Sequence, residues 1–186
     1  MGASQWTQQY GTTALVTGAS SGIGEQFARL LAERGFDLVL TARREPLLQA
    51  LKEKLEREHG IQVVCIVCDL CDVAQVDHLI AQALAMDVGL VVSNAGYGVM
   101  KCEFVSIPLD ELEAMYRANS QAPARIAHAM LPAMVAKKRG GFIFTGSIEG
   151  DAVFPLSAAY AASKAFLHSL VQALWYEVKD SGVDIL

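Results

Sequence analysis

The sequence lacks the features of a membrane protein or a nucleic-acid-binding protein. It has no stretch of about 18 apolar residues free of charge, so no membrane-spanning helix is predicted. Residues 1–11 contain no basic segment followed by an apolar block, which argues against a signal peptide. The 186 residues carry 15 Lys and Arg against 20 Asp and Glu, a net charge of −5. No broad positive field exists to attract nucleic acid or anionic lipid. We therefore expect a cytoplasmic protein with no nucleic-acid or membrane partner.

Cysteine is scarce, with four residues in the chain. Cys65, Cys68 and Cys71 have a spacing that resembles part of an iron–sulfur motif. Residues 61–67, however, have the composition of a buried strand, so the side chains of Cys65 and Cys68 would leave opposite faces and could not share a metal. We predict small buried thiols and no metal site, and nothing indicates an oxidising compartment.

Short apolar runs alternate with amphipathic helices along the whole chain. Hydrophobic residues make up 53% and charged residues 19%, as in a globular domain with a real core. The apolar runs predict strands at residues 13–17, 37–41, 61–67, 89–93 and 142–145, and the start of a sixth at 183–186. Strands without polar alternation, separated by helices, predict a doubly wound parallel α/β sheet in three layers, the Rossmann fold. We expect a single domain over residues 1–186.

A long helical stretch is predicted from about residue 109 to residue 136. Pro123 lies inside it and removes one backbone donor. We therefore expect a kink or a break near residues 119–122.

A glycine-rich turn, Thr17-Gly-Ala-Ser-Ser-Gly-Ile-Gly24, joins the first strand to the first helix. In this context Gly18 permits a tight turn, Gly22 lets a pyrophosphate approach the backbone, and Gly24 lets the helix pack closely on the strand. The helix N-terminus adds N–H donors and a favourable dipole. The alternative is a glycine turn without a ligand, but the strand before it and the helix after it favour a nucleotide. The predicted cofactor-binding residues of this turn are Gly18, Ser20, Ser21, Gly22, Ile23 and Gly24.

The end of the second strand indicates which dinucleotide is bound. An acidic residue there would hold the ribose 2′-hydroxyl of NAD, but the sequence is Thr41-Ala-Arg-Arg44. Arg43 or Arg44 could pair with a 2′-phosphate. The alternative is a solvated pair of arginines. We predict that NADPH is preferred over NADH.

Tyr160 and Lys164 form a Tyr-x-x-x-Lys pair in a helix predicted over residues 157–179. A spacing of four places both side chains on one helix face. An ammonium close to a phenol favours the phenolate, so the tyrosine can exchange a proton near neutral pH. Alone, this spacing is more often found on an ordinary surface helix, and the other motifs reverse that balance.

Taken together, the motifs resemble the short-chain dehydrogenase/reductase family in its compact branch. The glycine spacing of 18, 22 and 24 fits that branch, and Ser93-Asn-Ala-Gly96 resembles the family's Asn-Asn-Ala-Gly motif with Ser in the first position. Ser147 precedes Tyr160 by thirteen residues, as is typical of the family. The resemblance covers residues 12–186.

The resemblance implies a reaction and a role for each site residue. A hydride from NADPH would interconvert a carbonyl and an alcohol on a small-molecule substrate, with Tyr160 as the general acid or base. Ser147 would hydrogen-bond the substrate oxygen, Lys164 would hold the nicotinamide ribose, and Asn119 would anchor a water. Further implied cofactor contacts are Asp69, Asn94, Ala95, Gly96, Tyr160 and Lys164.

Family members normally continue past Leu186 with further strands and a segment that covers the substrate. We therefore expect a C-terminally incomplete chain that carries the dinucleotide-binding and catalytic residues but lacks the substrate-binding segment. If intact, it would form a homodimer or homotetramer. The alternatives are a cofactor-binding or dimerisation module with little activity, and a dehydratase or isomerase. His128 and His168 have no partner at ligand spacing, so we expect them to be structural or surface groups.

Overall fold

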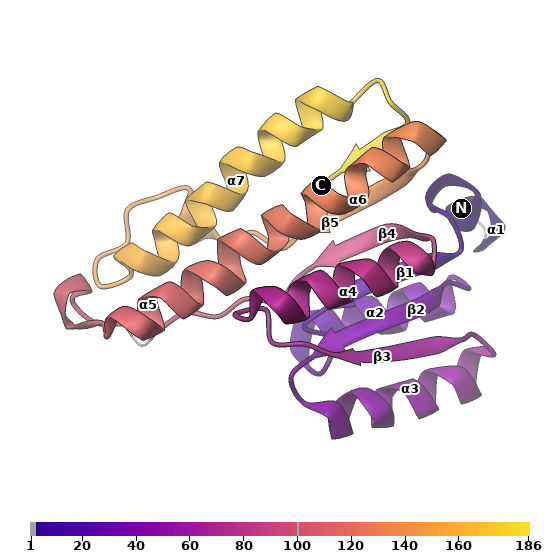
Figure 1. Cartoon of the computed structure of the whole chain (residues 1–186), viewed down its shortest axis with the longest axis horizontal. Coiled ribbons are helices and arrows are strands. Elements are labelled where there is room, and N and C mark those ends of the chain that lie inside the picture. Colours follow the sequence, from indigo (N-terminus) through magenta and orange to yellow (C-terminus); the bar gives the residue numbers. More distant parts are fainter. Residues whose placement is uncertain (1–2, 100) are drawn as a thin grey trace.

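The protein is built on one parallel β-sheet covered by helices on both faces (Figure 1). The computed structural model describes residues 3–99 and 101–186. Its strands are β1 (Thr13–Thr17), β2 (Asp37–Ala42), β3 (Val63–Val67), β4 (Val88–Ser93), β5 (Gly140–Phe144) and β6 (Val183–Ile185). They lie in the order β3-β2-β1-β4-β5-β6, and every neighbouring pair is parallel. This is the strand order of a doubly wound Rossmann fold, which confirms the predicted fold class.

The helices form two outer layers. One layer contains α1 (Ala3–Tyr10), α2 (Gly22–Glu33) and α3 (Glu45–His59). The other contains α4 (Val73–Ala85), α6 (Ala122–Lys137) and α7 (Ala158–Val178), with α5 (Leu109–Tyr116) leading into α6. Two 3-10 turns, η1 (Phe104–Ser106) and η3 (Ile148–Gly150), lie in the loops before α5 and α7.

The two helical layers explain why the strands show no polar alternation. In β1, Ala14 and Val16 pack against the layer of α2 and α3, whereas Leu15 packs against the layer of α4 and α6. All three side chains are fully buried. The same division separates Cys65 from Cys68, which pack against opposite core clusters as predicted. The sheet is therefore the middle of two hydrophobic cores.

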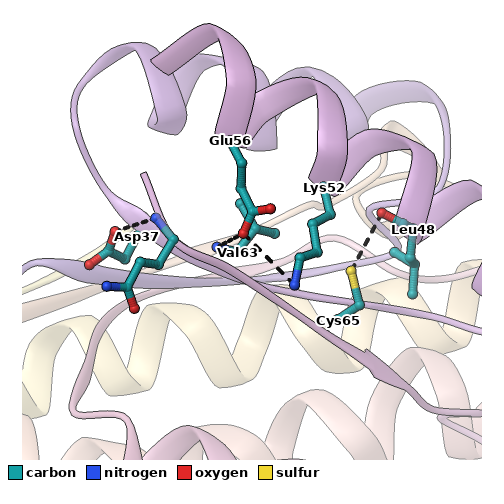
Figure 2. Close-up of polar contacts among 7 residues, drawn as sticks. Asp37, Leu48, Lys52, Glu56, Val63 and Cys65 are labelled. Atoms are coloured by element: carbon teal, nitrogen blue, oxygen red, sulfur yellow. Dashed lines mark hydrogen bonds and ion pairs between the residues drawn. The ribbon is translucent and has the colours of Figure 1, made fainter. Parts of the chain in front are cut away.

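The edge strand β3 is tied to α3 by side chains (Figure 2). Glu56 accepts a hydrogen bond from the Val63 N–H at 3.0 Å and lies 3.8 Å from the Lys52 ammonium. The Cys65 thiol donates to the Leu48 carbonyl at 3.4 Å. A helix side chain thus satisfies a backbone donor of an edge strand, which is one way in which sheet edges are protected from further pairing.

The break in the long helix falls where it was predicted, and its form is a π-helical turn. α5 ends at Tyr116, the π-turn η2 spans Arg117–Gln121, and α6 begins at Ala122. The Ala122 N–H bonds the Arg117 carbonyl, five residues back. Pro123 in the first turn of α6 has no N–H with which to continue the ordinary α-helical ladder. A second proline, Pro132, lies inside α6.

Helix α1 was not predicted from the sequence, and it is held by contacts with the edge strand β6. The Tyr10 hydroxyl donates to the Asp184 carboxylate of β6 at 2.8 Å, and the Gln9 amide donates to the same oxygen at 2.7 Å. Burial, this hydrogen bond and the Asp184 charge raise the pKa of Tyr10 to about 12. The helix therefore depends on a tertiary contact with the last strand.

We predict that Tyr10→Phe lowers the free energy of unfolding by about 0.5–1 kcal/mol at neutral pH, because it removes one partly exposed hydrogen bond. Because its pKa is raised in the folded protein, Tyr10 ionises in the unfolded chain at a lower pH than in the folded one, over a window of about pH 10 to 12. The wild type should therefore lose its stability advantage over Tyr10→Phe as the pH rises through that window. Urea unfolding at a series of pH values measures both effects. Tyr176→Phe, on a side chain that is 67% exposed, is the control; equal losses in the two variants would contradict the prediction.

Candidate active site

A cavity of about 480 Å³ opens at the carboxyl ends of the strands. Its wall is formed by the loops after β1 to β5 and by the first turns of α7. Ligands of open α/β sheets bind at this edge, where the strand order reverses between β1 and β4. The predicted site residues in the wall are Gly18, Ser20, Ser21, Ile23, Arg43, Asp69, Asn94, Ala95, Gly96, Tyr160 and Lys164.

The other predicted residues surround the cavity without forming its wall. Gly22 begins α2, and Ser147 follows the wall residue Gly146 in the loop after β5. Gly24 and Asn119 are buried. The structure thus brings residues from distant parts of the sequence to one edge of the sheet.

The glycine turn has the close packing that its motif requires. Gly18 has a φ of +70°, a conformation that favours glycine. A Cβ atom at Gly24 would lie 2.4 Å from the Gly18 carbonyl oxygen and 2.6 Å from the Asn94 amide nitrogen. α2 therefore starts directly at the cavity, where the positive end of its dipole favours an anion.

Positive charge lies beside this turn. The Arg44 guanidinium donates to the hydroxyls of Ser20 and Ser21 at 3.0 and 2.6 Å, and Arg43 also lines the cavity. The last residue of β2 is Ala42, so no carboxylate stands at the position where one would hold a ribose 2′-hydroxyl. This corner is suited to an anionic group that also accepts hydrogen bonds.

Asp69 closes another part of the wall. Its carboxylate accepts a hydrogen bond from the Cys71 N–H at 3.0 Å, and its own N–H donates to the Gln75 side chain at 2.9 Å. The loop after β3 is thereby fixed at the cavity.

Thr17 was not predicted as a site residue, yet its hydroxyl joins β1 to β4. It accepts hydrogen bonds from the N–H groups of Asn94 and Ala95, both at 3.0 Å, and lies 3.4 Å from the Val92 carbonyl. The Asn94 amide donates back to the Thr17 carbonyl at 3.2 Å. The sequence marks Thr17 only as the residue at which the first strand ends and the glycine-rich turn begins.

Asn119 lies in the π-turn and fixes the loop after β4. Its side chain is 1% exposed. The amide oxygen accepts from the Tyr97 N–H at 3.0 Å, and the amide nitrogen donates to the Tyr97 carbonyl at 2.8 Å and to the Ser163 hydroxyl at 3.1 Å. The Asn119 side chain therefore holds the backbone of Tyr97 in place.

Tyr160 and Lys164 both reach the cavity from α7, as their spacing predicted. The Lys164 ammonium is 5.9 Å from the centre of the Tyr160 ring and donates to the Thr145 carbonyl at 2.8 Å. Lys164 is only 4% exposed, and burial lowers its pKa. A buried cation next to a phenol at a cavity wall is an arrangement suited to proton transfer.

Ser147 has an unexpected neighbour in His168. The Ser147 N–H donates to Nε2 of His168 at 3.3 Å, and the Ser147 hydroxyl accepts from the Glu149 N–H at 3.3 Å. Nδ1 of His168 lies 2.7 Å from the Asp151 carboxylate. These contacts agree with the expectation of a structural group with no partner at ligand spacing, because the partners of His168 lie in the loop after β5 and not on its own helix.

Comparison with known proteins agrees with this geometry. Residues 12–186 match the family model described as short chain dehydrogenase. The chain belongs to the short-chain dehydrogenase family. It is 34% identical over 178 residues to a very-long-chain 3-oxoacyl-CoA reductase of Laccaria bicolor, an alignment that covers 94% of this chain and 53% of the relative. The chain therefore spans about half the length of that reductase.

Solved structures of family members have the same fold. A short-chain dehydrogenase from Sphingobium yanoikuyae in complex with NADPH is 35% identical, with a TM-score of 0.88 over 93% of this chain and 68% of that one. A bulky-bulky ketone specific alcohol dehydrogenase from Comamonas testosteroni is 30% identical, with a TM-score of 0.90 over 94% of this chain and 70% of that one.

Within residues 3–99 and 101–186, no helix is long and apolar enough to cross a bilayer.

Proposed function

We propose that this chain is the cofactor-binding and catalytic part of an NADP-dependent oxidoreductase that interconverts a carbonyl and an alcohol. The observation that carries the proposal is that Tyr160 and Lys164 line the same cavity as the Gly18 turn. Family membership and the similarity to a dehydrogenase in complex with NADPH support it. NADPH, when bound, supplies a hydride to the carbonyl carbon.

The residues of the cavity fit a phosphorylated dinucleotide. The α2 N-terminus and the turn from Gly18 to Gly24 would hold the pyrophosphate. Arg43 and Arg44, with Ser20, would hold the 2′-phosphate, because a guanidinium binds phosphate oxygens with directed hydrogen bonds.

The remaining cofactor contacts lie along the wall of the cavity. We assign Asp69 to the adenine end of the cofactor. Asn94, Ala95 and Gly96 would contact the cofactor where the strand order reverses between β1 and β4. This assignment agrees with the sequence-based prediction and remains a proposal.

In the proposed reaction, Tyr160 donates a proton to the substrate oxygen, or removes one in the reverse direction. Ser147 donates a hydrogen bond to the same oxygen and stabilises its developing charge. Lys164 keeps a positive charge close to the phenol and would bind the nicotinamide ribose. Its burial strengthens this electrostatic effect because little water screens it.

Asn119 would bind a water through its main-chain carbonyl. The side-chain amide is already engaged with Tyr97 and Ser163. The carbonyl lacks its usual donor four residues on, because Pro123 has no N–H. A water here would connect Lys164 with solvent and resupply protons.

The unit over residues 1–186 is proposed as a single dinucleotide-binding and catalytic domain. The very-long-chain 3-oxoacyl-CoA reductase is about twice as long as the aligned part, so the substrate and the activity of the whole protein are proposals. A cofactor-binding module with little activity is the second candidate. The cytoplasmic location stays a prediction.

We further propose that the chain forms a homodimer through α6 and α7. A groove of about 1320 Å³ runs between α4, α5, α6 and α7, and its apolar wall includes Phe166, Leu170 and Leu174. Phe166 is 46% exposed, which is unfavourable for a large aromatic side chain in water.

Sedimentation velocity tests the proposed homodimer. The wild type should sediment as a dimer, and Phe166→Glu should shift the protein toward monomer. A wild type that sediments only as monomer would contradict the proposed dimer.

NADPH oxidation with a panel of ketones and aldehydes tests the proposed reaction. Tyr160→Phe should lower kcat by about 1,000-fold or more, because it removes the proton donor, while the Kd for NADPH changes little. Tyr176→Phe on the same helix is the matched control and should keep the wild-type rate. Wild-type binding of NADPH without turnover would favour the cofactor-binding module, and an active Tyr160→Phe would exclude the proton-transfer role.

The preference for NADPH over NADH tests the role proposed for Arg43 and Arg44. Replacing both Arg43 and Arg44 by Ala should weaken NADPH binding by about 10- to 100-fold, because charge-assisted hydrogen bonds to a phosphate are lost. NADH binding should be nearly unchanged. Fluorescence titration measures both, with the exposed Arg57→Ala on α3 as the control. A wild type that binds NADH more tightly than NADPH would overturn the assignment.

A further inference from the structure

His168 lies on the face of α7 that carries Tyr160 and Lys164. Positions 160, 164 and 168 are four apart, so their side chains follow one another along one side of the helix. The loop after β5 lies against this side. Lys164 donates to the carbonyl of Thr145 at the start of the loop, and His168 contacts the loop two residues later.

The contacts of His168 indicate the tautomer of its neutral ring. Nε2 accepts a hydrogen bond from the Ser147 N–H at 3.3 Å, so this nitrogen carries no proton. The proton of the neutral ring is therefore on Nδ1, which donates to the Asp151 carboxylate at 2.7 Å. Asp151 thus selects the tautomer that can bind Ser147.

The loop is also shaped around the imidazole by two glycines. A Cβ atom at Gly146 would lie 2.5 Å from Nε2. One at Gly150 would lie 2.9 Å from the main-chain carbonyl carbon of Lys164 and 3.0 Å from Nδ1. Any other residue type at either position would require its neighbours to shift. The backbone on either side of Ser147 therefore rests directly on the ring, whose position determines where the Ser147 main chain lies.

We propose that His168 is a positioning residue that fixes Ser147 through its main-chain N–H and so places the Ser147 hydroxyl at the substrate oxygen. This rests on the proposed function, in which that hydroxyl binds the oxygen. A second contact, between the carboxylate of Glu149 and the Ser157 hydroxyl, holds the loop independently. Loss of His168 therefore displaces Ser147 without releasing the whole loop.

Two substitutions of His168 separate its hydrogen bond from its bulk. His168→Leu fills a similar space without an acceptor, and should lower kcat by up to about 100-fold, as small displacements of catalytic groups do. His168→Gln places an amide oxygen near the site of Nε2 and should restore most of the rate. The Kd for NADPH should be the same in all three proteins. Equal rates for the Leu variant and the wild type would overturn the proposal.

A double-mutant cycle distinguishes positioning from a merely structural role. If His168 acts through Ser147, then His168→Leu should change the residual kcat of Ser147→Ala by less than about twofold, because coupled residues are not additive. A structural role would lower kcat equally in both backgrounds, and that result would also overturn the proposal.

The amide NMR signal of Ser147 tests the contact without any turnover. Its shift and its protection from hydrogen exchange should be retained in His168→Gln and lost in His168→Leu, and the wild-type imidazole should show the Nδ1–H tautomer. If the chain binds NADPH but reduces none of the panel, the proposed reaction fails while this measurement still decides the positioning. A Ser147 amide unaffected by His168→Leu would refute it.

Discussion

A chain of hydrogen bonds that starts at Thr17 connects the two halves of the sheet and fixes the cavity between them. The Thr17 hydroxyl binds the backbone of Asn94 at the end of β4. The Asn94 side chain accepts from the Thr145 hydroxyl after β5 at 3.3 Å, and the Thr145 carbonyl accepts from Lys164 on α7. Parallel strands place their carboxyl ends together, but these side-chain contacts set the distances between them. The glycine turn and the Tyr160 helix therefore share one rigid frame.

The fold was predictable because its determinants are local or periodic. Apolar runs marked the strands, and Pro123 located the break near Asn119 even though the sequence did not indicate a π-turn. Helix α1 was missed because it has only eight residues, too few for helical spacing to be seen over several turns, and is held by Asp184, far along the chain. Propensity within eight residues cannot report such a contact.

The candidate site was predictable only where its residues belong to a motif. Gly18, Tyr160 and Lys164 were predicted from their spacing, and the structure places them in one cavity. Thr17 and His168 were missed, because each acts on backbone N–H groups of a distant loop. Any loop offers such groups whatever its side chains, so the sequence of the loop carries no signal of the contact. The small residues Gly146 and Gly150 were the one trace of the imidazole that they face.

The hydrogen bonds between α1 and β6 also have a consequence for the order of folding. Tyr10 and Asp184 are separated by 174 residues, and closing so long a loop carries a large entropic cost before the contact forms. During synthesis from the N-terminus, α1 emerges well before its partner strand. The helix thus cannot reach its final place until β6 has been made and has joined β5, so the docking of α1 reports that these two strands have paired.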